Sequence, residues 1–133
     1  MYRVHLVVGV GSLLLFLATG AYMLFGFPEL YQQREEIRMM YRATHIYLLM
    51  SSLINLMSAN FISRVAADLH PRLSSIASLL IVISSALLAA AFFIEPQEYL
   101  IDRPITFWAV VFLLAGVLVH TILNTLMLRS KRN

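Results

Sequence analysis

Four stretches of this 133-residue chain contain no Asp, Glu, Lys or Arg. They are residues 4–28, 43–63, 73–94 and 104–128, which are 25, 21, 22 and 25 residues long. A helix needs roughly 20 residues to cross a hydrocarbon core about 30 Å thick, so each stretch is long enough to span a bilayer. Strands of a membrane barrel would be about 10 residues long with alternating polarity, which none of the four shows. Because backbone polar groups in lipid must be bonded within the protein, the sequence predicts transmembrane helices.

The composition agrees with this prediction. Hydrophobic residues make up 60% of the chain and the mean hydropathy is +0.80, which is more apolar than a soluble domain of this size. The chain has no cysteine, so disulfides, thiolate metal sites and Cys nucleophiles are excluded. The ten basic residues lie beside the predicted spans and form no concentrated stripe, so we do not expect nucleic-acid binding.

Short connections join the four predicted spans, and prolines mark their boundaries. These prolines are Pro28, Pro71, Pro96 and Pro104. Short connections make consecutive helices antiparallel neighbours. The sequence therefore predicts an all-α integral membrane protein in which residues 1–133 form a single domain, a four-transmembrane-helix up-down-up-down bundle. Residues 32–41 are expected to extend the second span as an interfacial helix, because Ile37 and Tyr41 share one helical face.

The charges outside the spans predict the orientation. Four crossings return the carboxyl terminus to the side of the amino terminus, and this side carries six of the ten Lys and Arg residues. The positive-inside rule then places both termini in the cytoplasm. The four-span pattern is typical of small proteins of the bacterial inner membrane, which is where we expect the chain.

Polar residues inside the spans are the first group of candidate functional residues. Ser12, Asn55, Ser78 and His120 all lie roughly 12 Å inside the surface on the terminal side, at a rise of about 1.5 Å per residue. They are predicted to form one polar layer. The main interpretation is that the layer fixes the helix register by hydrogen bonds, and the alternative is a pocket for a ligand or water.

A basic stripe is the second group. Arg34, Arg38 and Arg42 recur every four residues, and His45 follows on nearly the same helical face. We expect Arg38, Arg42 and His45 to hold an anion, such as a lipid phosphate or a ligand carboxylate.

Two cofactors are the alternatives at these positions. A b-type haem would place its propionates on Arg38 and Arg42, with His45 and Met23 as axial ligands. A quinone could instead form a hydrogen bond with His45 or His120. No metal site is expected outside the haem alternative.

Catalytic signatures are absent from the predicted spans. No Asp or Glu lies inside one, which disfavours proton-coupled export and two-carboxylate hydrolysis. The paired serines at 51–52 and 84–85 have no base at the spacing of a catalytic triad. We therefore expect a protein that is not an enzyme.

Without a catalytic signature, the functional hypothesis rests on the surfaces of the predicted spans. Nearly all of the mass lies in the spans, so the helix surfaces in the membrane are its main surfaces for recognition. Ala86, Ala90 and Gly116 are expected to serve contacts beyond the bundle. The sequence thus predicts a non-enzymatic accessory subunit or scaffold that packs, within the lipid bilayer, in a homo-oligomer or a larger membrane complex. The alternative is a membrane redox or small-ligand protein that binds b-type haem, quinone or lipid.

Overall fold

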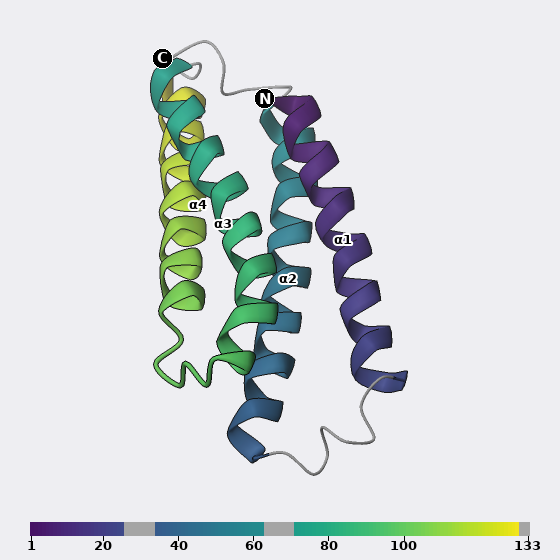
Figure 1. The fold of residues 1–133 in the computed structure, drawn as a ribbon. Helices are drawn as coiled ribbons and strands as arrows, with labels where there is room; N and C mark the ends of the chain where they lie inside the picture. The colour runs from purple at the N-terminus through teal and green to yellow at the C-terminus, as the bar shows by residue number, and fades with distance from the viewer. Residues whose placement is uncertain (26–33, 63–70, 131–133) are drawn as a thin grey trace.

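Four helices form the protein, and successive helices run in opposite directions (Figure 1). The computed structural model describes residues 1–25, 34–62 and 71–130. The helices are α1 (Tyr2–Phe25), α2 (Glu35–Ile62), α3 (Pro71–Gln97) and α4 (Pro104–Ser130). The amino and carboxyl ends lie at the same end of the bundle (Figure 1). The predicted all-α, up-down-up-down bundle is confirmed.

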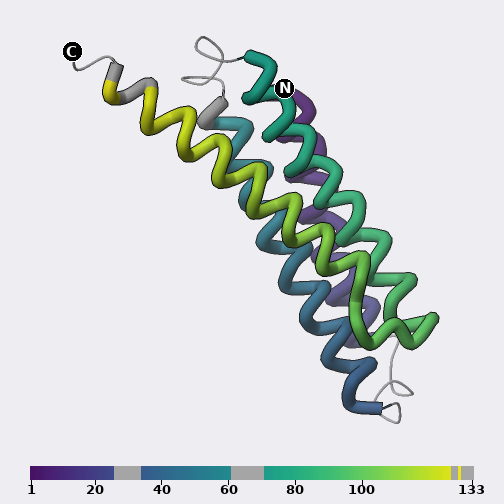
Figure 2. The backbone as a smooth tube through the Cα atoms, turned by 90° about the vertical axis from the view of Figure 1, so that its left-hand side faces the viewer, coloured from purple at the N-terminus to yellow at the C-terminus, as the bar shows by residue number. Residues whose placement is uncertain are grey.

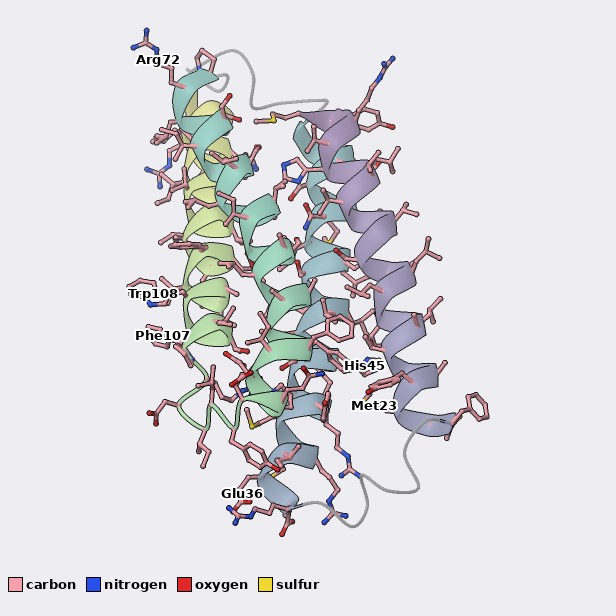
Figure 3. The ribbon with its side chains drawn as sticks, in the orientation of Figure 1. Met23, Glu36, His45, Arg72, Phe107 and Trp108 are labelled. Carbon is pink, nitrogen blue, oxygen red and sulfur yellow. The ribbon has the colours of Figure 1, made fainter. Side chains whose placement is uncertain are left out.

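The outer surface is apolar, as lipid requires. Within the described part of the chain, three helices are long and apolar enough to cross a membrane: α1, α3 and α4. Large side chains such as Leu14 are exposed, and Figure 3 shows Phe107 and Trp108 on the outer side of α4. In 28-residue α2, the polar residues Ser51, Ser52 and Asn55 are all buried and thus shielded from lipid. By length and composition, this is a membrane-spanning helical protein.

The bundle is built from two helical hairpins. Helix α1 packs mainly on α2, and α4 packs on α3; the contact between α2 and α3 joins the two hairpins. Figure 2 shows α3 and α4 meeting at the turn that connects them and spreading apart toward the chain termini. The outer helices α1 and α4 therefore each pack mainly on one other helix.

Two glycines allow close helix packing within the hairpins. A Cβ atom at Gly9 would lie 2.8 Å from the side chain of Leu56, where α1 meets α2. A Cβ atom at Gly116 would lie 2.7 Å from the backbone oxygen of Ala77, where α4 meets α3. Small residues of this kind let helix backbones approach closely in membranes. Gly116, which the sequence analysis assigned to contacts beyond the bundle, is used inside it.

The amino-terminal part of α2 is helical, as expected for the interfacial extension. Ile37 and Tyr41 are buried there in an apolar cluster with Leu88 and Phe92 of α3. The rings of Tyr41 and Phe92 meet edge to face, with centroids 5.1 Å apart. The apolar face of the extension therefore packs on protein rather than on the membrane surface. Residues 32 and 33 lie outside the described part of the chain.

The prolines differ in their effect on helix ends. Pro71 and Pro104 are the first residues of α3 and α4, where the missing N–H costs nothing. Pro96 does not end α3, which continues to Gln97. The bond from the N–H of Glu98 to the carbonyl of Ile94 continues the helical pattern past Pro96. The helix thus extends beyond the uncharged stretch at 73–94, and the additional residues include Glu95. Pro28 lies outside the described residues.

Candidate functional site

A buried carboxylate, Glu95, caps the amino end of α4. Its side chain is 0% exposed. The backbone N–H of Thr106 donates to Oε1 at 2.7 Å, and the Thr106 hydroxyl donates to Oε2 at 2.6 Å. Thr106 is the third residue of α4, so its N–H has no partner within the helix. The carboxylate supplies that partner and places negative charge at the positive end of the helix dipole.

Arg103 extends this contact to α2. Its Nε donates to Glu95 Oε2 at 3.4 Å, and its Nη2 donates to the hydroxyls of Thr44 at 2.6 Å and Thr106 at 3.1 Å. The Thr44 hydroxyl in turn donates to the carbonyl of Met40 at 2.9 Å, which leaves its lone pairs for Arg103. Thr44, Glu95, Arg103 and Thr106 form what we call the Glu95 network. It connects α2, α3 and α4.

The Glu95 network also stabilises an unfavourable backbone conformation at Arg103, in the turn between α3 and α4. Arg103 has a φ of 52°, in the left-handed region that non-glycine residues rarely adopt. The conformation is more unusual because Arg103 precedes a proline, where extended backbone is preferred. Both oxygens of Glu95 are occupied by donors from the chain itself. These contacts give the network a structural role, because they join the end of α3 to the start of α4.

The burial of Glu95 differs from what the sequence predicts. The uncharged stretch at 73–94 predicts that Glu95 lies in the connection between the last two spans, with no carboxylate buried in the bundle. The structure buries it completely and pairs it with Arg103. The sequence did contain a usable pattern, because an acid directly after an apolar run precedes an arginine at the start of the next run. Opposite charges that flank a tight helical turn can meet across it.

A second group of buried polar residues surrounds Asn55. The Asn55 amide donates to the carbonyl of Ser51 and to the hydroxyl of Ser85, both at 2.9 Å. Its oxygen faces Nδ1 of His5 at 2.8 Å, so Nδ1 must carry the proton and donate. The hydroxyls of Ser51 and Ser85 are 2.7 Å apart. His5, Ser51, Asn55 and Ser85 form what we call the Asn55 network, which connects α1, α2 and α3.

The predicted polar layer consists of Ser12, Asn55, Ser78 and His120, and all four side chains are buried. The structure brings Ser78 and His120 together, with Oγ and Nε2 3.2 Å apart. It places Asn55 in a separate network. Ser12 lines a groove between α1 and α3. His5 lies on the same buried face of α1 as Ser12, and it is His5 rather than Ser12 that contacts Asn55.

The residues of the basic stripe differ in their exposure and contacts. Arg42 is exposed, and within the described ranges the ion pair that the structure contains joins Arg103 and Glu95 instead. His45 turns toward α1, where Nδ1 lies 3.0 Å from the hydroxyl of Thr19. Arg38 is partly buried. The anion that the sequence analysis assigned to Arg38, Arg42 and His45 stays a prediction.

The haem alternative meets a packed interface. His45 and Met23 both lie where α1 meets α2 (Figure 3). The His45 ring stacks on Phe16 with centroids 4.1 Å apart. A Cβ atom at Gly20 would lie 3.1 Å from Cε1 and 3.6 Å from Nε2 of the same ring. Helix α1 therefore encloses this face of the imidazole and leaves no opening there for a porphyrin.

A groove between α2 and α4 contains the other chemically notable residue, His120. The groove has a volume of about 280 Å³, and its lining combines four apolar side chains with four polar ones, which are Ser58, His120, Thr121 and Asn124. His120 Nε2 contacts Ser78, whereas its buried Nδ1 has no hydrogen-bond partner among the described residues. Those residues also contain no group of three or more acidic or histidine side chains that could hold a metal ion.

Replacing Glu95 should destabilise the bundle. In Glu95→Leu, Arg103 loses its negative partner and the Thr106 N–H loses its acceptor, so we expect the free energy of unfolding to fall by about 3 kcal/mol. Glu95→Gln keeps an acceptor for that N–H and should cost less, about 1 to 2 kcal/mol. Denaturant unfolding in detergent micelles measures both changes. Glu98→Leu, at an exposed position in the same turn, is the matched control. Equal stability of Glu95→Leu and wild type would contradict this role.

The two polar groups should behave independently. Asn55→Leu and His120→Leu should each cost roughly 1 kcal/mol, because each leaves a buried partner unsatisfied. Since they belong to different networks, the double variant should lose the sum of the two values. Asn55→Leu combined with His5→Leu should lose less than the sum, because these residues share one bond. A larger coupling between Asn55 and His120 than between Asn55 and His5 would refute this division.

Comparison with known proteins does not add a family to these contacts. Models of protein families, curated proteins and solved structures give no match to the chain. The function is therefore inferred from the residues and their geometry.

Proposed function

We propose that the chain is a non-enzymatic membrane protein that associates laterally, as a homo-oligomer or as an accessory subunit of a larger membrane complex. The observation that carries this proposal is a shallow groove of about 270 Å³ between α1 and α3. Its lining includes the small residues Gly11, Ser12, Ala86 and Ala89. We call it the α1–α3 groove.

Small residues matter here because lipid gives helices no hydrophobic reason to associate. Transmembrane helices instead gain from close van der Waals packing, which small residues permit. Gly9 and Gly116 already serve such contacts inside the bundle. Gly11 does not, since a Cβ atom there would meet nothing within 4 Å. Gly11 and Ala86 are both exposed. This small-residue surface is therefore free to receive a helix of another chain.

The buried polar chemistry is consistent with this role. The carboxylate of Glu95 is bonded to the donors of its own network. The side chain of Asn55 likewise uses both its oxygen and its nitrogen within the bundle. Groups that are bonded in this way stabilise a fixed helix arrangement. A rigid bundle with an open lateral groove suits a subunit that packs against other helices.

Gly11→Leu should separate association from folding. The new side chain has space in the monomer but fills the α1–α3 groove. We expect the wild type, extracted from native membranes with its lipids, to have the mass of an oligomer or complex, and Gly11→Leu to shift toward the monomer. Light scattering measures the mass. Ala21→Leu, at an exposed position of α1 outside the groove, is the control. Recovery of only lone wild-type monomers would overturn the proposal.

We further propose that both termini face the cytoplasm and that the membrane is the bacterial inner membrane. The support is the charge distribution, because six of the ten Lys and Arg residues lie in the segments at the terminal end. The connection between α3 and α4 would then face the periplasm.

Single cysteines test this orientation cleanly, because the natural chain has none. In intact bacterial cells, a membrane-impermeant maleimide should label Glu98→Cys in the α3–α4 turn and should not label Asn133→Cys. After the cells are opened, both positions should react. Labelling of Asn133→Cys alone in intact cells would reverse the orientation.

A further inference from the structure

We propose that the α2–α4 groove binds the neutral carbonyl group of an apolar molecule, with His120 as the hydrogen-bond donor. This site lies on a different pair of helices from the α1–α3 groove, so it adds a ligand to the scaffold role and does not depend on it.

The groove exists because α2 and α4 hardly touch each other. Each packs on α3 instead, and Ile81 of α3 lies between them. Ile54 and Met57 line the α2 side, and Val117 and His120 line the α4 side. His120 contacts Ser78 of α3 at this level, so α4 stays on α3 and the groove opens on the side of α4 that faces α2. The groove thus presents an apolar surface with a few polar atoms.

The hydrogen bonds of His120 identify which atom is free. His120 is 9% exposed, and Ser78, which contacts its Nε2, is 0% exposed. The Ser78 hydroxyl makes no other hydrogen bond with the described residues, so its proton is satisfied only if it donates to Nε2. The proton of the neutral ring is then on Nδ1. This N–H is buried and has no acceptor among the described residues.

The chemistry of the lining selects the ligand. A free N–H requires an oxygen acceptor, and the lining of the groove contains no Asp, Glu, Lys or Arg. A carboxylate would bring an uncompensated charge into this apolar surface, whereas a neutral carbonyl would not. Asn124 follows His120 by one helical turn and also lines the groove, so its amide can bind a second oxygen.

The size of the groove limits how much of the ligand it holds. A volume of about 280 Å³ lies just below the range of roughly 300 to 1,000 Å³ for small-molecule sites. It suits a polar head group with the start of a chain, while the remaining chain lies in the bilayer. Two membrane molecules carry this chemistry: the ester carbonyl of a phospholipid and the ring carbonyl of a quinone with an alkyl tail.

Nitrogen NMR of the histidine rings distinguishes the two sources. Protein labelled with ¹⁵N-histidine is placed in nanodiscs of ether-linked phospholipids, which lack carbonyls, and His120→Gln assigns the His120 resonances among the four histidines. A shift of the Nδ1–H resonance in ester-linked lipid would identify the lipid carbonyl. A shift on adding decylbenzoquinone to the ether-linked nanodiscs would identify the quinone. Identical spectra in all three samples, or an equal shift with decylbenzene, would overturn the proposal.

A groove-filling variant tests the position of the ligand. Val117→Phe should weaken the response of His120 to whichever ligand shifts it by at least tenfold in concentration. Leu118→Phe, on the next residue of α4 and 61% exposed, should leave the response unchanged. Asn124→Leu, a smaller change, should weaken binding about fivefold through the loss of one hydrogen bond. Full binding by both groove variants would refute the site. Gly11→Leu should not alter these spectra, so failure of the scaffold proposal remains distinguishable.

Discussion

Polar groups inside this bundle have to bond to each other, because lipid offers no partner, and this constraint organises the helices. The Asn55 network bonds α1 to α2 and α3, and the Glu95 network bonds α4 to the same two helices. Further bonds from Ser52 to the carbonyl of Gly9 and from Ser78 to His120 follow the same rule. Helices α2 and α3 are thus the central pair. The polar side chains in the middle of α2, Ser51, Ser52 and Asn55, are buried against these neighbours, whereas the charged residues Glu35, Glu36 and Arg42 at its amino end are exposed.

The fold could be predicted from the sequence because hydrocarbon imposes a simple requirement on long segments without charge. The same reasoning failed where a charge was neutralised inside the protein. Glu95 was read as the start of a connection because charge and the following proline usually mark a helix end. Its burial depends on Arg103, on Thr106 and on the turn that brings them together. Hydropathy along the sequence does not predict contacts of this kind between residues of different helices.

The candidate sites show a similar division between what spacing determines and what packing determines. Spacing correctly put Ser78 and His120 at similar depths, and they are bonded. It could not give the offset of α1 along its axis, which brings His5 to Asn55. It also could not give the rotation of α2, which turns His45 toward Thr19 and Phe16. Helix offsets and rotations depend on contacts such as those at Gly9 and Gly20, which involve two segments at once.

The Glu95 network also bears on the α2–α4 groove at the opposite end of α4. It fixes the amino end of α4 against α2 and α3, and Gly116 keeps the middle of α4 close to α3. Beyond Gly116, His120 still contacts Ser78 of α3, so this part of α4 stays on α3 and hardly touches α2. The groove therefore opens between α2 and α4, while α3 forms its floor through Ile81. A ligand that enters it meets a formed surface and does not have to separate packed helices, which lowers the cost of binding.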